Sequence, residues 1–367
     1  MMNQQHAADA ARQFLGEGQI LAVTAYGSGH INDTFSVDFL ECNKRARFIL
    51  QRINTGIFKD TAALMQNIER VTAHLAHKLR DDPGRDRRVL RLIPARDGRS
   101  WYRDGEGNDW RAYRFIEGAR TCDRVESAAQ AYQAAKAFGQ FQSMLADLPA
   151  PRLNDSIPDF HNTPKRFKAF EQALNADAAN RAALAGPEIE FAFARQSIAQ
   201  VLLGANLPER VTHNDTKFNN VLFDDVSGEG ICVLDLDTVM SGLSLYDFGD
   251  MVRTATSAAD EDERDLSKVR MEFPMFDALL RGYLSTAGGI LSPVEIENLV
   301  CAGKLITFEQ GIRFLADYLA GDSYYKVQRE GQNLDRCRTQ FKLIQSIEEQ
   351  EERMMRLVSE AMNEQGS

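Results

Sequence analysis

The first hundred residues alternate short apolar runs with turn residues. Three of these runs, LAVTAY (21–26), TFSVDF (34–39) and RFILQRI (47–53), have the length and composition of strands, and their order predicts a meander. The segment GSGHIND between the first two is rich in glycine and turn residues, which is typical of a flexible hairpin tip. Further along, RVLRLIPA and WYRDGEGNDWRAYRFIEG predict two more strands around a glycine-rich turn.

A helical pattern lies between these strands. In DTAALMQNIERVTAHLAHKL, Leu64, Ile68, Val71 and Leu75 recur at helical spacing and share one face. The pattern therefore predicts an amphipathic helix that packs on the sheet.

The character of the chain changes after EGAR (117–120). Long helical patterns occupy SAAQAYQAAKAFGQFQSMLADL, 164–180 and 187–204, and a short hairpin of VLFDD and ICVLDLD around SGEG is predicted before further helices. The patterning predicts an α+β protein with two lobes. A small antiparallel-sheet lobe is expected over residues 1–118 and a larger, mostly helical lobe over residues 119–367.

Length and composition agree with this organisation. The chain has 367 residues, which suits two lobes, and 43 basic against 53 acidic side chains leave a net charge of −10. That balance argues against nucleic acid or an anionic membrane as the main partner. Five scattered cysteines give no sign of a zinc site or a disulfide framework, and we see neither a signal peptide nor a membrane-spanning apolar stretch. We expect a cytoplasmic protein, either a monomer or a weak dimer.

The polar segment VTHNDTKFNNVL (211–222) concentrates candidate chemistry between two apolar runs. The carboxylate of Asp215 can accept a proton from a hydroxyl nucleophile, and the amide of Asn220, five residues later, can turn back to ligate a metal. Asp235, on a neighbouring strand, would complete the metal site, and Lys217 can supply a cation near the moving charge. Phosphoryl transfer uses this inventory of a base, oxygen ligands for Mg²⁺ and a cation.

These residues carry a resemblance to a known family. H-x-D-x-K-x-x-N at 213–220, followed by D-x-D at 235–237, resembles the catalytic and metal-binding loops of protein-kinase-like small-molecule kinases, the aminoglycoside phosphotransferase superfamily. Within it, GSGHINDTF, FILQRINTGIF, YRFIEGARTCD, HNDTKFNNVLFD and LDLDTVMSGLSLYDFGD are most similar to the N-acetylhexosamine 1-kinases. The resemblance runs in order from about residue 20 to residue 330. It implies a two-lobed protein-kinase-like fold, ATP as co-substrate and Mg²⁺ as cofactor.

The resemblance also implies site residues. Asp215 would be the catalytic base in contact with the acceptor, with Lys217 beside it. Asn220 and Asp235 would bind magnesium, and Asp237 is either a further ligand or a turn residue. The residues expected to contact the nucleotide are Gly27, Ser28 and Gly29 at the phosphates, Gln51 and Arg52 on the third strand, and Arg114, Phe115, Ile116 and Glu117 at the hinge beside the adenine.

The chain departs from the family pattern at three places: the third strand, the middle of the H-R-D motif and the D-F-G motif. The strand FILQRI has Gln51 and Arg52 where a lysine is expected to contact the nucleotide phosphates. Glu69, on the predicted helix, either pairs with Arg52 as a kinase glutamate pairs with its lysine, or lies on a solvated helix face. Asn214 occupies the middle of the H-R-D motif, and D-F-G is replaced by D-L-D at 235–237.

Further candidates surround the acceptor and the loop. His213 is interpreted as structural rather than catalytic, and Asp247, in YDFGD, would brace the loop from a following helix. His30 either touches the acceptor sugar or packs under the glycine tip. GIRFLADYLAGDSYY resembles the sugar-binding segment of the hexosamine kinases, which nominates Arg313 and Tyr324; for Arg313 the alternative is burial against a carboxylate.

The sequence thus predicts a kinase that transfers the γ-phosphoryl group of ATP to the anomeric hydroxyl of an N-acetylhexosamine (GlcNAc or GalNAc). The alternative is a kinase for another small alcohol, such as an aminoglycoside, choline or homoserine. A cationic acceptor needs a pocket lined by carboxylates, and the segment 260–265 (DEDERD) is acidic enough to supply them. A non-catalytic, nucleotide-binding pseudokinase would account for the missing strand lysine. Such a scaffold has no reason to retain Asp215, Asn220 and Asp235 together.

Overall fold

The computed structural model describes residues 4–27, 31–203 and 205–365. The chain divides into two compact units, and each is described by itself. Unit 1 consists of Met1–Asp123, Asp147–Pro158 and Leu222–Met240, and unit 2 consists of Arg124–Ala146, Asp159–Val221 and Ser241–Ser367.

An antiparallel sheet forms the first part of unit 1. Its strands are β1 (Gln19–Ala25), β2 (Asp33–Glu41), β3 (Lys44–Ile53), β4 (Leu92–Ile93), β5 (Tyr102–Arg103) and β6 (Asp109–Arg114). They lie in the order β1-β2-β3-β6-β4, and β5 also pairs with β6. Strands β1 to β3 confirm the predicted meander. The pairing of β3 with β6 places Gln51 directly opposite Arg111.

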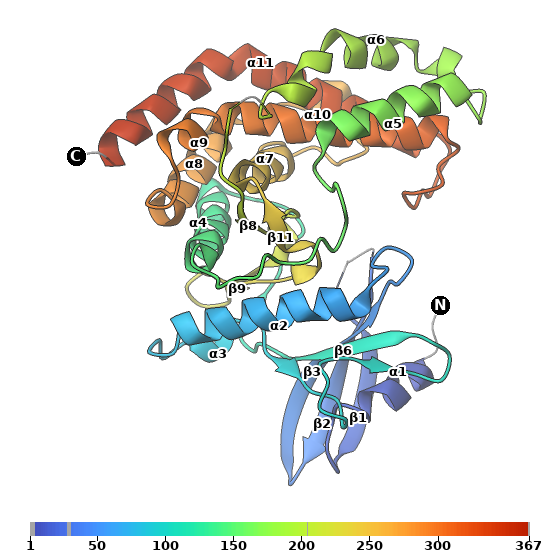
Figure 1. Ribbon diagram of the computed structural model, residues 1–367, viewed down its shortest axis with the longest axis vertical. Coiled ribbons are helices and arrows are strands. Elements are labelled where there is room, and N and C mark those ends of the chain that lie inside the picture. The colour runs from blue at the N-terminus through green and yellow to red at the C-terminus, as the bar shows by residue number, and fades with distance from the viewer. Residues whose placement is uncertain (1–3, 28–30, 204, 366–367) are drawn as a thin grey trace. The chain divides into compact units, whose positions relative to one another are not determined.

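Two helices of unit 1 bury apolar side chains. Helix α1 (Gln4–Ala11) lies beside β1 and β2 (Figure 1) and adds its alanines to a core that contains Trp110. Helix α2 (Thr61–Lys78) begins after Asp60, whose side chain accepts a hydrogen bond from the amide of Ala63 at 2.9 Å. The predicted apolar face of α2 is buried at all four positions, which confirms the amphipathic pattern. Helix α3 (Arg85–Arg88) is a single turn.

A smaller sheet completes unit 1. It consists of β7 (Ala119–Arg120), β9 (Val221–Asp224) and β10 (Gly230–Val233) in the order β10-β9-β7, and β9 with β10 is the predicted hairpin. The carboxylate of Asp224 accepts hydrogen bonds from the amides of Val226 at 3.0 Å and Ser227 at 2.7 Å, and these bonds shape the turn. A 3-10 turn, η4 (Leu236–Thr238), follows β10.

Unit 2 is mostly helical, as the sequence predicts. Its helices are α4 (Ala128–Leu145), α5 (Thr163–Ala176), α6 (Gly186–Ala194), α7 (Ser244–Ala255), α8 (Phe273–Ala287), α9 (Pro293–Glu297), α10 (Leu299–Leu319) and α11 (Gln332–Gln365). Short 3-10 turns are η1 (Ala182–Leu184), η2 (Gln196–Gln200), η3 (Phe218–Asn220) and η5 (Leu266–Lys268), and strand β8 (Arg210–Thr212) pairs with β11 (Met240–Gly242).

The predicted helix over 187–204 is shorter than expected. Helix α6 ends at Ala194, because Arg195 leaves the helical region with φ −116° and ψ 17°. The guanidinium of Arg195 pairs with Glu348 at 2.8 Å and lies 3.8 Å from the ring centroid of Phe191. These tertiary contacts outweigh the local helical pattern.

Aromatic side chains from α5, α10 and α11 form the core of unit 2. Figure 1 shows α10 and α11 side by side, with α5 next to α10. Phe308 of α10 stacks on Phe167 and Phe341 with ring centroids 6.2 and 6.3 Å away. Helices α4 and α8 approach each other closely, since a Cβ on Gly282 would lie 2.3 Å from the carbonyl oxygen of Tyr132.

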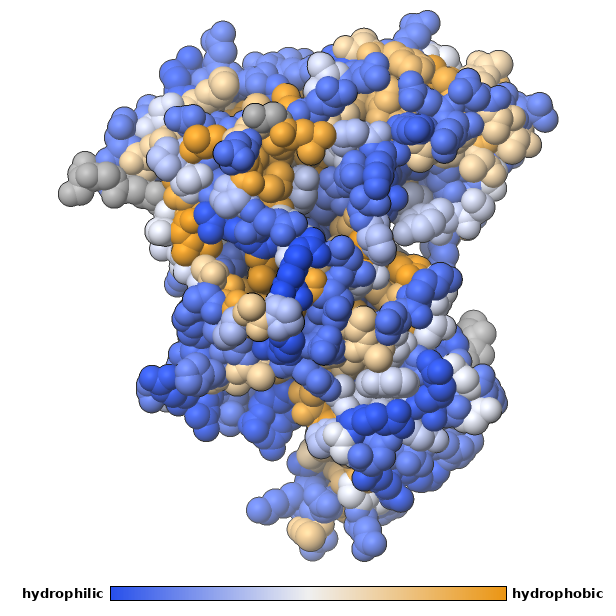
Figure 2. Space-filling view, viewed as in Figure 1, coloured by the Kyte–Doolittle hydropathy of each residue, from blue (hydrophilic) through white to orange (hydrophobic). Residues whose placement is uncertain are grey.

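Hydrophilic residues cover most of the face shown in Figure 2. Within the described part of the chain, no helix combines the length and the hydropathy that a membrane crossing requires.

Candidate active site

Helix α7 holds the polar loop that follows β8. Asp247, which is fully buried, accepts hydrogen bonds from the backbone N–H groups of His213 at 2.9 Å and Asn214 at 2.7 Å. The side chain of Gln142, from α4, also donates to this carboxylate. The bracing role predicted for Asp247 is therefore confirmed.

The loop turns sharply at Asn214. Its φ of 65° lies in the left-handed region, which asparagine tolerates better than most residues. The amide oxygen of Asn214 accepts a hydrogen bond from the hydroxyl of Thr212 at 3.0 Å. His213 is fully buried, and its ring meets Phe138 and Phe141 edge-on at centroid distances of 5.4 and 5.8 Å. This packing confirms the structural interpretation of His213.

Asp215, Lys217 and Asn220 come together within the loop. The amide Nδ2 of Asn220 donates to the backbone oxygen of Asp215 at 2.8 Å and to its carboxylate Oδ2 at 3.2 Å. The ammonium of Lys217 lies 2.9 Å from Oδ1 of the same carboxylate. The side chain of Asp215 remains 24% exposed and that of Lys217 47% exposed, so both are accessible to a substrate.

The electrostatic environment keeps this carboxylate ionised. Burial raises the pKa of Asp215, but the charges of Lys217 and Arg253 lower it, and the pKa falls below its ordinary value. Asp215 in turn raises the pKa of Lys217 against the effect of burial. At neutral pH the loop therefore presents an anion that can accept a proton and a cation beside it.

Helix α7 adds a buried pair that the sequence pattern did not single out. Arg253 donates to Oδ1 of Asp250 through Nε at 2.8 Å and through Nη2 at 2.7 Å. Arg253 lowers the pKa of Asp215, and Asp250 raises the pKa of Lys217, so the pair lies within electrostatic range of the loop. The signal was present in YDFGDMVR, where the aspartate and the arginine are three residues apart on one helix face.

The predicted acceptor residue Arg313 lies on α10 among aromatic rings. Its guanidinium donates to Oε1 of Gln310 at 3.2 Å and lies 5.5 Å from the ring centroid of Phe160 and 5.8 Å from that of Tyr325. In the part of the chain that the structure describes, Arg313 forms no ion pair with a carboxylate. The carboxylate of Glu309, on the same helix, is nevertheless close enough to raise the pKa of Arg313 against the effect of burial. The acceptor role of Arg313 and its burial against a carboxylate both stay predictions.

The tyrosine beside Arg313 is Tyr325. Tyr324, the predicted contact, is 59% exposed, and its role in acceptor binding stays a prediction. The buried carboxylate of Asp317 organises this segment, because it accepts hydrogen bonds from the backbone amides of Tyr324 at 2.8 Å and Tyr325 at 2.9 Å.

His161 connects the loop to α10, a contact that the sequence pattern did not predict either. Nδ1 of His161 lies 2.8 Å from Oε1 of Glu309, and Nε2 lies 3.0 Å from the backbone oxygen of Asn214. Burial lowers the pKa of His161, but Glu309 and the Asn214 carbonyl raise it, and the net shift is upward. A protonated ring can donate to both oxygens, which stabilises the loop conformation.

In unit 1, Gly27 has a φ of 77°, a conformation that glycine adopts without steric cost. The other predicted tip residues, Ser28 and Gly29, and the acceptor candidate His30 lie outside the described residues. Their roles stay predictions.

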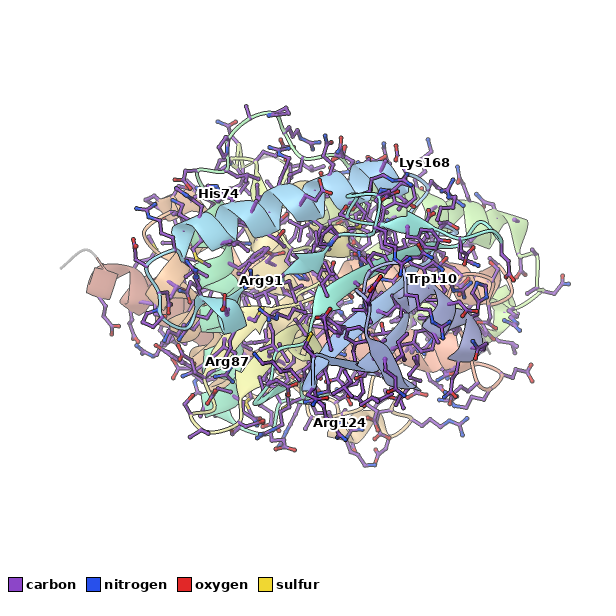
Figure 3. The ribbon with its side chains drawn as sticks, turned by 90° about the horizontal axis from the view of Figure 1, so that it is seen from below. His74, Arg87, Arg91, Trp110, Arg124 and Lys168 are labelled. Atoms are coloured by element: carbon purple, nitrogen blue, oxygen red, sulfur yellow. The ribbon has the colours of Figure 1, made fainter. Side chains whose placement is uncertain are left out.

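The predicted hinge, Arg114–Glu117, leaves the end of β6. The amide of Phe115 donates to the backbone oxygen of Arg47 at 3.3 Å, and the guanidinium of Arg47 lies 3.9 Å from the Phe115 ring centroid. Arg47 also pairs with the carboxylate of Glu117 through Nε at 2.9 Å. Arg87, labelled in Figure 3, donates to the carbonyl oxygen of Glu117 at 3.1 Å. Ile116, between them, is buried.

The third strand offers no pairing between Arg52 and the helix glutamate. Arg52 donates to the carboxylate of Asp33 at 2.8 Å and to the amide oxygen of Asn108 at 3.1 Å, while Glu69 is exposed. Of the two alternatives for Glu69, the solvated helix face is confirmed and the pair with Arg52 is not, because Asp33 is directly opposite Arg52 in the β2–β3 register and is within easy reach.

The two aspartates of D-L-D lie in different environments. Asp235 is exposed, and its φ of 53° and ψ of 63° place it in the left-handed region. Asp237 is only 2% exposed. One of its oxygens pairs with Arg111, and the other accepts a hydrogen bond from the amide of Asn32 at 2.7 Å.

Oxygen donors that suit magnesium are present in each unit. The carboxylate of Asp235 is exposed, and in the described part of the chain the amide oxygen of Asn220 accepts no hydrogen bond. Mg²⁺ prefers such carboxylate and amide oxygens, so these residues fit the ion. Within residues 4–27, 31–203 and 205–365 there is no group of three or more His, Cys, Asp and Glu side chains that could hold a metal.

Comparison with known proteins defines the family. The phosphotransferase enzyme family (APH) matches residues 22–279, which is more than half of the chain, and the chain therefore belongs to this family. A microcompartment-associated aminopropanol kinase is 15% identical over 96% of this chain and 98% of that chain, with a TM-score of 0.58. A choline kinase from Cryptosporidium parvum Iowa II is 14% identical over 91% of each chain, with a TM-score of 0.56.

A further similar structure is the spectinomycin phosphotransferase APH(9)-Ia in complex with ADP and spectinomycin. It is 12% identical over 95% of this chain and 97% of that chain, with a TM-score of 0.58. These similarities confirm the predicted two-lobed, kinase-like α+β fold. The family match makes the protein a phosphotransferase.

Proposed function

We propose that this protein transfers the γ-phosphoryl group of ATP to the anomeric hydroxyl of an N-acetylhexosamine, GlcNAc or GalNAc. The observation that carries the proposal is the arrangement at Asp215, whose ionised and partly exposed carboxylate has Lys217 on one oxygen and the amide of Asn220 on the other. These groups are the base, the cation and the metal ligand that phosphoryl transfer to a hydroxyl requires.

The proposed reaction follows from these positions. Asp215 accepts a hydrogen bond from the acceptor hydroxyl and takes its proton as the new oxygen–phosphorus bond forms. The bond between the γ-phosphorus and the β,γ-bridging oxygen breaks, and ADP leaves with that electron pair. Lys217 stabilises negative charge on the group in transfer. Asn220 and Asp235 would bind Mg²⁺, which neutralises charge on the nucleotide phosphates when it is present.

The charges around Arg313 favour a neutral acceptor over a cationic one. Burial lowers the pKa of Arg313, but Tyr325 and Glu309 raise it, and the net shift is upward although Arg253 opposes it. Burial and the charge of Arg313 lower the pKa of Arg166. Three guanidinium groups thus lie within electrostatic range of one another, with the carboxylate of Glu309 among them. A quaternary ammonium or a polycationic aminoglycoside would be repelled by such a cluster. Guanidinium donors beside the ring of Tyr325 suit the hydroxyl and acetamido oxygens of a sugar.

The acidic segment 260–265 does not offer an alternative pocket for a cation. Arg329 donates to the carboxylate of Asp262 at 3.0 Å, and Arg124 pairs with Asp260. Lys268 lies 3.4 Å from the carboxylate of Glu263. Because basic side chains of unit 2 already pair with these carboxylates, the segment is better explained as a solvated, ion-paired surface loop.

An acceptor panel tests the proposal. Purified protein with Mg²⁺ and ATP is supplied with GlcNAc, GalNAc, glucose, homoserine, choline, ethanolamine or spectinomycin, and ADP release is followed by a coupled assay. We expect ADP release that depends on the N-acetylhexosamines. Turnover of choline, ethanolamine or spectinomycin without turnover of either hexosamine contradicts the proposal, and nucleotide binding without turnover of any acceptor supports the pseudokinase.

A further inference from the structure

A buried arginine lies one strand away from the position where β3 lacks a lysine. Arg111 of β6 is directly opposite Gln51 in the β3–β6 register, and its Nε donates to Oε1 of Gln51 at 2.9 Å. Its neighbours in the strand, Trp110 and Ala112, belong to the core that α1 covers, so Arg111 points to the opposite face of the sheet. Figure 3 labels Trp110 within this sheet. A buried cation is thus present on β6, directly beside Gln51 of β3.

Arg111 forms an ion pair with Asp237 of the D-L-D segment. The side chains are 1% and 3% exposed, respectively. Burial lowers the pKa of Arg111, but Asp237 and Asp235 raise it, and the net shift is upward, so the guanidinium stays charged. Removing either partner of an ion pair that is buried to this degree destabilises the fold strongly, because the remaining charge is left without compensation.

The ion pair lies two residues from a strained backbone position. Asp235 has left-handed φ and ψ angles, which aspartate tolerates better than most residues but at a higher free energy than glycine. Leu236 is 2% exposed, and Asp237 is held by Arg111 and Asn32. The residues that follow Asp235 are therefore fixed, while its own side chain stays exposed.

We propose that Arg111 is a positioning residue for the metal-binding carboxylate. By holding Asp237, it fixes the D-L-D segment in the conformation that presents Asp235 to a magnesium–nucleotide complex. Asp237 is then an anchor for the segment and not a second metal ligand. The inference rests on the proposed function, since it concerns the metal that the reaction uses.

Asn32 extends this anchor to the segment that follows the glycine tip. Its Nδ2 donates to Asp237, and its Oδ1 accepts a hydrogen bond from the backbone amide of Asn54 at 3.0 Å. The side chain of Asn54 donates in turn to the backbone oxygen of Ile31 at 3.2 Å. One buried carboxylate thus connects the end of the tip, the end of β3 and the D-L-D segment.

The test measures metal binding and stability without an acceptor. Mn²⁺ binding is followed by electron paramagnetic resonance in the presence of a non-hydrolysable ATP analogue, and unfolding temperatures are measured without ligands. The variants are Arg111→Lys, Arg111→Met, Asp237→Asn and the double variant Arg111→Met/Asp237→Asn. The exposed ion pair of Arg99 and Asp97, in the same unit, gives matched controls in Arg99→Met and Asp97→Asn.

We expect each single variant at Arg111 or Asp237 to bind Mn²⁺ about tenfold or more weakly than the wild type, as for other residues that orient a metal ligand. The unfolding temperature should fall by about 10 °C in Arg111→Met and in Asp237→Asn, because each leaves a buried charge or its partner unpaired. The unfolding temperature of the double variant should fall little further than that of the less stable single variant. Arg111→Lys keeps the charge and is the variant that decides the result if Arg111→Met does not fold. The controls should behave as wild type.

Wild-type Mn²⁺ affinity in the folded Arg111 variants overturns the inference. Loss of Mn²⁺ binding confined to Asp237→Asn also overturns it, because Asp237 would then be a ligand. Additive losses of stability in the double variant overturn the anchor itself. A wild-type protein that binds Mn²⁺ and nucleotide but phosphorylates no hexosamine contradicts only the proposed function, whereas one that binds neither contradicts both.

Discussion

The amide of Asn220 donates to the backbone oxygen of Asp215 at 2.8 Å and to its carboxylate at 3.2 Å. The five-residue spacing lets one side chain fix both the main chain and the side chain of the proposed base. Lys217, between them in sequence, approaches the other carboxylate oxygen at 2.9 Å. The loop thus presents a preorganised carboxylate, which is the feature on which the proposed reaction depends.

Replacement of the proposed base tests its role directly. Asp215→Asn should reduce kcat by about 10²–10⁴-fold, because the amide cannot accept the proton of the acceptor hydroxyl. The KM for ATP and the unfolding temperature should change little. ADP release measures kcat and the KM for ATP, and thermal unfolding measures the unfolding temperature. Asp97→Asn, at an exposed site, is the control. A kcat near that of the wild type would rule out Asp215 as the base.

Asp247 should be essential to the shape of the loop. Asp247→Ala removes the acceptor for two backbone amides and for Gln142 in a fully buried site, and we expect the free energy of unfolding to fall by about 3 kcal/mol. Chemical denaturation measures this loss, and turnover should fall as well. Unchanged stability would show that other contacts hold the loop.

The ion pair of Glu295 and Arg210 predicts a dependence of stability on pH. Burial raises the pKa of Glu295, but hydrogen bonds from Arg210, Ser244 and Ser292 lower it to about 2, from an ordinary value of 4.5. A lowered pKa stabilises the fold above pH 4.5, and this contribution is lost as the pH falls toward 2. Glu295→Gln should therefore be about 3 kcal/mol less stable than the wild type at pH 7.

The difference between Glu295→Gln and the wild type should narrow between pH 4.5 and pH 2. Denaturant titrations at several pH values measure it. A constant difference over that range would mean that the stabilisation does not depend on the ionised carboxylate.

Arg313 should affect acceptor binding and leave nucleotide binding unchanged. Arg313→Met should raise the KM for the N-acetylhexosamine about tenfold or more, because donors for the sugar oxygens are lost. Arg353→Met is the matched control, since the guanidinium of exposed Arg353 also lies over an aromatic ring, 3.5 Å from the centroid of Phe273. A raised KM for ATP, or an equal effect of the control, would contradict the assignment.

Local patterns predict much of this fold. The meander of β1 to β3, the buried face of α2 and the hairpin of β9 and β10 follow from periodicity and turn residues, which act over a few positions. The end of α6 is not predictable in this way. It depends on Arg195, whose partner Glu348 is 153 residues away in sequence.

The same limit applies to the candidate site. The loop from Asp215 to Asn220 is recognisable because its spacing is local and its residues fit one chemistry. The pair of Arg111 and Asp237 joins residues that are 126 positions apart, and the pair of His161 and Glu309 joins residues 148 positions apart. Neither pair leaves a short motif in the sequence, so only the tertiary structure identifies them.

The most direct test of the proposed function is phosphorus nuclear magnetic resonance of the product. Wild-type protein with Mg²⁺, ATP and GlcNAc or GalNAc should produce a phosphomonoester resonance that is split by the anomeric proton of the sugar, together with ADP, and Asp215→Asn should produce neither at a comparable rate. The absence of this resonance with both sugars, or its formation at the wild-type rate by Asp215→Asn, would contradict the account.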